Sequence, residues 1–301
     1  MNDRGRFRGC LLGLAVGDAL GTTVEFKARG SFPPVTDMVG GGPFRLLAGQ
    51  WTDDTSMALC LAASLAETGR FDPADQAARY ARWMDAGYMG SNGTCVDVGL
   101  TTRAALRAFQ ETGDPYSGPT SPNRAGNGCI MRLAPIPMFC FPDRELTLQL
   151  SGESSRTTHG AAECIDACRL LGDVLFRGLC GWPKDRVLTN GPKLELCSPR
   201  LREVADAGYA SLPEEAIRGS GYVVDSLEAA LWCFATTESY RDAVLRAANL
   251  GDDADTTAAV CGQIAGAYYG EAAIPRQWRE KLARRDEIEM LADMLCDRRA
   301  V

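Results

Sequence analysis

Apolar residues recur at helical spacing along most of this chain, and this feature limits the fold more than any other. Side chains three or four residues apart share one face of an α-helix, whereas the alternation typical of strands is scarce here. Turn signals rich in glycine and proline separate the segments. The pattern predicts an all-α bundle. Its helices are expected within residues 11–20, 57–65, 77–84, 100–109, 161–175, 226–234, 243–250 and 258–269.

The length and composition favour one globular domain. A chain of 301 residues with 46% hydrophobic and 24% charged residues can bury a large core. Residues 113–127 and 178–199 are rich in Gly, Pro, Ser and Asn, so we expect surface excursions there rather than linkers. Since no internal repeat or low-complexity tract occurs, residues 1–301 are predicted to form a single domain.

The charge and the cysteines narrow the possible partners and location. A net charge of -7 offers no broad attraction for nucleic acid, which we exclude as a primary partner. Asp18 interrupts the one apolar run that imitates a signal peptide, and no membrane span is predicted. The twelve cysteines are scattered and include no Cys-x-x-Cys pair, so we expect most of them to be buried thiols. We expect a cytoplasmic monomer.

The first motif with possible chemistry is WTDDTS at residues 51–56, directly before a small and apolar helical segment. Thr and Asp at such a place commonly cap the helix and complement its positive end. For one cluster, capping is the simpler interpretation.

A second cluster, NLGDDADTT at residues 249–257, also precedes a helix of small residues. Caps rarely need more than one acid each, and five carboxylates brought close together would repel one another. A bound cation would remove this conflict. The five acids are Asp53, Asp54, Asp252, Asp253 and Asp255.

The ligand chemistry of the clusters favours a hard cation. Carboxylate and hydroxyl oxygens suit Mg²⁺ or Mn²⁺, and two ions could share bridging aspartates. Zinc is disfavoured because the chain has one histidine, and the glycine and closing glutamate of a calcium hand are missing. Glycine and alanine around both clusters would let the helices approach closely and bring their N-termini together.

The chain resembles the ADP-ribosylglycohydrolases, a family that includes the enzyme reactivating dinitrogenase reductase. The resemblance spans nearly the whole chain and implies an all-α, orthogonal helical bundle with a dinuclear Mg²⁺ or Mn²⁺ centre. It rests on GCLLGLAVGDALG at 9–21, TDDT at 52–55, DVG at 97–99, GNG at 126–128, Met131, Arg132, Thr158, His159 and GDDADTT at 251–257.

The resemblance also implies roles for individual residues. By motif position, the metal ligands would be Thr52, Asp53, Asp54, Asp253, Asp255 and Thr256. Asp252 falls outside this set and reads as a surface acid. Asp97 is the candidate for proton transfer, although a lone acid before a helix is ordinarily a cap. Glu25 is similar to an acid that approaches the metals and is the second candidate for proton transfer, but on the sequence alone it could be a surface residue.

Substrate contacts are expected mainly in the glycine-rich loop. Gly99, Asn127, Gly128, Met131 and Arg132 would border ADP-ribose, since glycine permits close approach and free amides can meet a diphosphate. By itself Gly-Asn-Gly is just a turn. An isolated histidine such as His159 is more often structural, but its family position suggests a ligand contact. Tyr222 could stack on adenine, and core packing is its alternative role.

The implied function is a metal-dependent hydrolase that cleaves ADP-ribose from an acceptor, with protein arginine favoured. The substrate would be an ADP-ribosylated protein or a small ADP-ribose conjugate. O-linked ADP-ribose on serine or an acetyl group stays an alternative, as does a crystallin-like structural or ADP-ribose-binding protein. Retention of both acidic clusters argues against the latter. Leu100 stands where the dinitrogenase reductase enzyme has asparagine, which leaves the acceptor open.

Overall fold

The computed structural model describes residues 3–189 and 194–298, and in these ranges the regular secondary structure consists of helices joined by loops. Two isolated bridges, Gly41 with Leu46 and Gly126 with Tyr222, are the only β pairing in these residues. The all-α prediction is confirmed. Among the described helices, none combines the length and the apolar character that a membrane crossing needs.

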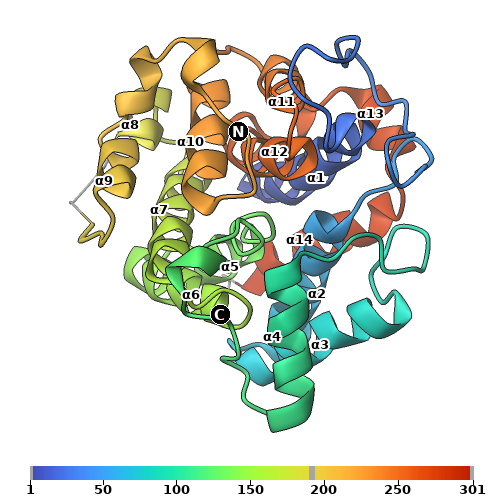
Figure 1. Cartoon of the computed structure of the whole chain (residues 1–301), viewed down its shortest axis with the longest axis vertical. Helices are drawn as coiled ribbons and strands as arrows, with labels where there is room; N and C mark the ends of the chain where they lie inside the picture. Colours follow the sequence, from blue (N-terminus) through green and yellow to red (C-terminus); the bar gives the residue numbers. More distant parts are fainter. Residues whose placement is uncertain (1–2, 190–193, 299–301) are drawn as a thin grey trace.

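Two antiparallel helices, α1 (Asp3–Gly21) and α12 (Ala254–Tyr269), lie side by side at the centre of the molecule (Figure 1). Glycines at four-residue spacing on α1 face α12 so closely that side chains would not fit. A Cβ on Gly13 would lie 2.3 Å from the Gly262 carbonyl oxygen, and one on Gly17 would lie 2.1 Å from that of Ala258. This register brings the C-terminal end of α1 beside the N-terminal end of α12.

The other helices surround this pair. In Figure 1, α2 to α4 lie on one side and α7 to α10 on the other, with α11 beside α12. Their bounds are α2 (Asp53–Thr68), α3 (Pro73–Ala86), α4 (Leu100–Thr112), α5 (Pro135–Cys140), α6 (Arg144–Arg156), α7 (Ala162–Leu179), α8 (Lys184–Leu188), α9 (Pro199–Ala205), α10 (Val223–Ala235), α11 (Tyr240–Ala248), α13 (Arg276–Lys281) and α14 (Arg285–Asp297).

All eight predicted helical segments fall on helices and extend past them by two residues at most, but several helices are longer than predicted, with α1 starting eight residues earlier. The sequence analysis missed α5, α6, α8, α9, α13 and α14. Helix α5 starts at Pro135. Proline is favoured at the first position of a helix because its missing N–H is not needed there, but the two prolines in this short helix made its helical pattern hard to recognise. The 113–127 excursion contains one short 3₁₀ turn, and the 178–199 excursion contains α8; the turn signal at 191–192 lies outside the described residues.

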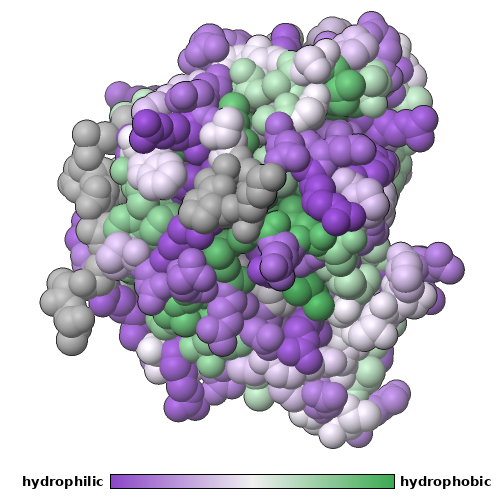
Figure 2. All heavy atoms as spheres, turned by 90° about the vertical axis from the view of Figure 1, so that its left-hand side faces the viewer, coloured by the Kyte–Doolittle hydropathy of each residue, from purple (hydrophilic) through white to green (hydrophobic). Residues whose placement is uncertain are grey.

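The cysteines behave as expected. Nine of the twelve are buried, and all twelve, which fall within the described residues, are free thiols. The surface is mixed in character. On the side of α8 and α9, hydrophilic residues spread over the whole face, with hydrophobic ones between them (Figure 2).

Candidate active site

The first turn of α2 is capped by a carboxylate from another helix. Asp18, in the last turn of α1, is fully buried and accepts four hydrogen bonds. Its Oδ1 accepts from the Thr52 backbone N–H (3.0 Å) and hydroxyl (2.9 Å), and its Oδ2 accepts from the Thr55 backbone N–H (3.0 Å) and hydroxyl (2.6 Å). The side chain of Thr52, the N-cap residue, makes no capping bond.

The first turn of α12 has the same arrangement. Glu25, on the loop after α1, accepts at Oε2 from the backbone N–H groups of Ala254 (3.0 Å) and Asp255 (3.2 Å). Asp253, the N-cap residue, makes no side-chain capping bond. Neither N-cap side chain makes a capping bond, so the capping interpretation of the first motif is wrong; in the second cluster, Asp255 Oδ1 accepts from the Thr256 N–H (2.8 Å). Caps supplied by α1 and its following loop leave the clusters' acids available for another task.

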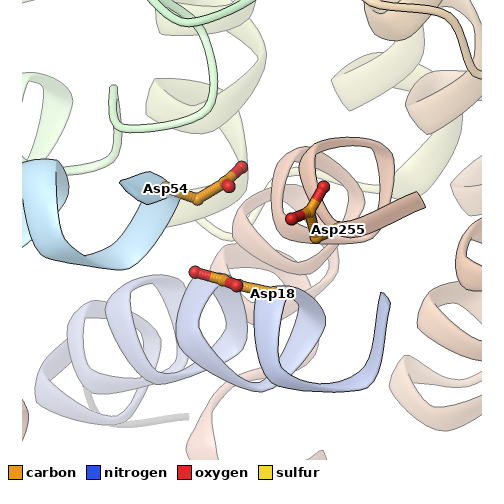
Figure 3. A group of neighbouring side chains, drawn as sticks. All are labelled: Asp18, Asp54 and Asp255. Atoms are coloured by element: carbon orange, nitrogen blue, oxygen red, sulfur yellow. The ribbon is translucent and has the colours of Figure 1, made fainter. Parts of the chain in front are cut away.

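Acids from three helices converge between these two N-termini. Asp18, Asp54 and Asp255 point toward one another from α1, α2 and α12 (Figure 3), each offering an oxygen within 4.8 Å of the others. Glu25, Asp253 and Asp255 form a second such group, which shares Asp255 with the first. Both groups could hold a metal ion.

Two features of the first group fit a cation. The Thr52 hydroxyl lies 2.9, 3.1 and 3.2 Å from carboxylate oxygens of Asp18, Asp54 and Asp255. A hydroxyl has one proton and can donate to only one of them, so the other contacts set oxygen against oxygen. In addition, Asp54 Oδ1 is buried without a hydrogen-bond partner. A hard divalent ion bound by these oxygens would satisfy both.

The raised pKa values of the clustered acids also fit a bound cation. Burial raises the pKa of Asp18 to about 6 and that of Asp255 to about 8, with Asp253 and Asp18 adding repulsion at Asp255. Burial, followed by nearby carboxylates, also raises the pKa values of Glu25, Asp53, Asp54 and Asp253. The centre is therefore acidic in composition but poorly suited to holding all of its negative charges without a counterion.

The acids form the floor of a cavity of about 470 Å³, a size common for small-molecule sites. Of the expected metal ligands, Asp53, Asp253, Asp255 and Thr256 line it, while Thr52 and Asp54 lie beneath. Both proton-transfer candidates, Glu25 and Asp97, also line it, as do Gly99, Asn127, Gly128, Met131 and His159. Asp252 is exposed and outside the lining.

Asp97 has an unusual backbone. Its φ is +55°, in the left-handed region, and its Oδ1 accepts from the following backbone N–H of Val98 at 2.7 Å. The N-cap of α4 is Gly99, so Asp97 does not cap that helix. Its charge contributes to the raised pKa of Asp53 on α2. Asp97 is thus electrostatically coupled to the acidic floor.

The Gly126–Gly128 loop supports the acidic centre as well as bordering the cavity. Asn127 Nδ2 donates to Asp253 Oδ2 (2.8 Å), so this side chain orients an acid rather than pointing freely at a ligand. Glycine is required at position 128, since a Cβ there would lie 2.8 Å from His159 Cε1.

His159 is held by a chain of hydrogen bonds. Arg132 Nη2 donates to the Thr158 hydroxyl (2.7 Å), which lies 2.8 Å from His159 Nδ1. Because arginine only donates, the Thr158 proton is free to bond Nδ1, an arrangement in which the neutral imidazole carries its proton on Nε2. Burial lowers the pKa of His159 to about 4, which keeps the ring neutral. His159 thereby presents an N–H donor at the cavity wall.

Two expected substrate contacts are corrected. Arg132 is fully buried beneath the loop, where it also donates to the Gly128 carbonyl (2.6 Å), and it does not line the cavity. Tyr222 lies outside the lining too, and its hydroxyl donates to Glu163 (2.7 Å). In both cases a hydrogen bond within the protein occupies the polar end that would have met the ligand.

Asp18 is the site residue that the sequence analysis missed. It was noted only as the acid that interrupts an apolar run. A lone carboxylate within a glycine-spaced helix has a high cost of burial unless several donors satisfy it. This cost of burial was the sequence signal that could have identified Asp18 as a site residue.

A polar cavity floored by carboxylates that converge from separate helices defines a candidate centre for divalent-cation chemistry in an all-helical fold. This chain belongs to the ADP-ribosylglycohydrolase family, whose model matches residues 1–301, and it is a glycohydrolase.

Individual relatives agree with this assignment. The chain is 46% identical to ADP-ribosylarginine hydrolase Tri1 of Pseudomonas putida, over 97% of this chain and 78% of that protein. It is 34% identical to the ADP-ribosyl-[dinitrogen reductase] glycohydrolase of Rhodospirillum rubrum, over 95% of this chain and 92% of that one. A solved ADP-ribosylglycohydrolase-related protein complex contains a chain that is 45% identical, with a TM-score of 0.86 and 99% coverage of both chains.

Proposed function

We propose that this protein hydrolyses the N-glycosidic bond between ADP-ribose and an arginine side chain of a modified protein. The observation that carries the proposal is the convergence of the α2 and α12 N-termini, with their acids, on one cavity. The arginine acceptor is supported by relatives at 46% and 44% identity that are named ADP-ribosylarginine hydrolases. A crystallin-like structural role is not favoured, because it gives no reason to bury so many acids.

The proposed centre holds two Mg²⁺ or Mn²⁺ ions. Asp18 is better placed as an orienting residue than as a ligand, because four N–H and O–H donors already occupy its two oxygens. Asp54 is better placed as a ligand, because its buried Oδ1 has no hydrogen-bond partner. The proposed ligands are therefore Thr52, Asp53, Asp54, Asp253, Asp255 and Thr256, with Asp18 behind them.

Bound cations would supply positive charge to orient the ribose hydroxyls and a water molecule. In the proposed reaction, the water oxygen forms a bond to the anomeric carbon, and the carbon–nitrogen bond breaks with its electron pair going to the guanidine. One proton passes from water to that nitrogen. Asp97 and Glu25 are the groups proposed to carry it, since both line the cavity beside the acidic floor.

The remaining wall is proposed to bind the ADP part of the substrate. The neutral His159, with its proton on Nε2, is a donor for a diphosphate oxygen, and Gly126 and Gly128 let the backbone approach closely. Arg132 acts indirectly in this proposal, by fixing Thr158 and the loop.

A release assay tests the proposal. Purified protein is incubated with arginine-linked, serine-linked and O-acetyl ADP-ribose, each with Mg²⁺, with Mn²⁺ and with EDTA, and free ADP-ribose is quantified. We expect release from the arginine conjugate that requires either ion. Faster release from serine or from the acetyl ester would overturn the acceptor, and release that persists in EDTA would overturn the metal centre.

A further inference from the structure

Two exposed apolar side chains stand at the rim of the acidic cavity. Leu100 is 77% exposed and Phe26 is 67% exposed, which places them among the three most exposed large apolar residues in the described part of the chain. Both line the cavity, whereas the third, Leu47 at 71%, does not. Apolar groups held in water beside a polar site call for an apolar partner.

Phe26 is held outward by the backbone rather than by packing alone. Its φ of +63° is unfavourable for a bulky residue, and a hydrogen bond from its N–H to the Asp252 carbonyl (2.8 Å) maintains it. The Asp252 N–H in turn donates to the Lys27 carbonyl (2.8 Å). The ring meets Phe44 edge-on, with centroids 6.2 Å apart. A strained conformation secured on both sides is typical of a functional position.

The rim residues adjoin the acids proposed to transfer the proton. Phe26 directly follows Glu25, and Leu100 is three residues beyond Asp97 at the start of α4. A group that protonates the departing nitrogen must lie next to the acceptor. In the proposed reaction the acceptor therefore passes near Glu25 and Asp97, and so near Phe26 and Leu100 on the same cavity wall, while the diphosphate is assigned to Gly128 and His159.

We infer that Phe26 and Leu100 form an acceptor clamp that receives the aliphatic stem of the arginine. The inference rests on the proposed function and adds how the site selects its acceptor. Arginine combines a cationic head with three methylene groups, matching an acidic floor below an apolar rim. A serine acceptor offers one methylene and no cation, so the clamp favours arginine over serine.

Two substrates that differ in this stem test the inference. ADP-ribosylguanidine has no methylenes on the guanidine, whereas ADP-ribosylagmatine has four, followed by a terminal ammonium that neither variant changes. We expect Leu100→Asn and Phe26→Asn each to raise KM for the agmatine conjugate about three- to tenfold, with kcat little changed, since each buried methylene contributes roughly a threefold to fourfold factor in affinity. Hydrolysis of ADP-ribosylguanidine should be unchanged. Asparagine is chosen because it nearly preserves the size of leucine and tolerates the left-handed backbone at position 26.

Matched variants separate this effect from general damage. Leu100→Met, which keeps the rim apolar, should restore the KM of the parent, and Leu47→Asn, at an equally exposed leucine outside the cavity, should change neither substrate. Equal losses on both conjugates, or no loss on the agmatine conjugate, would overturn the clamp while leaving arginine hydrolysis intact. If the parent protein cleaves neither conjugate, the proposed function itself fails and the clamp fails with it.

Discussion

The N-termini of α2 and α12 are capped in the same way but by acids in very different settings. Asp18 belongs to the last turn of α1, is fully buried and uses both oxygens for four bonds to the start of α2. Glu25 belongs to a loop, lines the cavity and uses one oxygen for two backbone bonds to α12. One cap is built into the central helix pair, and the other borders the reaction space.

The difference suggests that the two capping acids have different roles. A cap that is saturated with donors fixes the geometry of the acidic floor, whereas a cap with one oxygen that accepts no backbone N–H can interact with substrate or protons. Both replace the capping bond that the N-cap side chain would make, because α1 and its following loop supply the carboxylates instead. The comparison can be tested by perturbing each cap and the packing behind it.

The largest expected effect comes from the packing that places Asp18. In Gly17→Ala, the added Cβ would lie 2.1 Å from the Ala258 carbonyl oxygen, so α1 and α12 must separate. We expect the free energy of unfolding to fall by about 3 kcal/mol or more, with loss of activity. Urea unfolding measures this. Gly5→Ala is the matched control, since no atom lies within 4 Å of its Cβ, and a loss of stability there equal to that of Gly17→Ala would refute the close-packing argument.

The two caps should respond unequally when a carboxylate becomes an amide. Asp18→Asn sets an NH₂ group against donors of Thr52 or Thr55, and we expect a loss of about 2 kcal/mol in unfolding free energy. Glu25→Gln keeps a carbonyl oxygen for both α12 N–H groups, so the stability of the metal-free protein should hold or rise while turnover falls. Thermal and urea unfolding of both variants provide the test. Equal losses of stability would remove the distinction between the caps.

A smaller effect is expected from pH. A buried acid with a raised pKa stabilises the fold when protonated, so its contribution is complete below its unfolded pKa and is lost as pH rises through the folded value. With Asp18 at about 6 and Asp255 at about 8, the metal-free protein should lose stability between about pH 4 and pH 8. Saturating Mn²⁺ should reduce this slope. Melting temperatures across that range, with and without the ion, check it, and identical slopes would contradict the electrostatic account.

Much of the fold followed from local sequence signals, and the failures have physical causes. Long segments with strong apolar periodicity, such as α7 and α12, were recognisable, whereas proline-led α5 was not. The two acidic motifs could be associated because each precedes a helix of small residues. The carboxylates that cap these two helices could not be identified from the sequence. The hydrogen bonds from Thr55 to Asp18, for example, depend on how α1 crosses α2. Arg132 shows the same limit. The motif identified it as a site residue, but the sequence could not show that its guanidinium donates to Thr158 and Gly128 within the protein.

The most direct test asks whether the two acidic clusters bind metal together. Calorimetric Mn²⁺ titrations compare the parent with Asp53→Asn on α2, Asp255→Asn on α12 and the exposed control Asp252→Asn, with ADP-ribose release measured on the same samples. We expect two ions per chain in the parent and the control, and weakened binding with loss of most turnover in both cluster variants, each still folded. Parental Mn²⁺ binding and near-normal turnover in either cluster variant would contradict the shared metal centre.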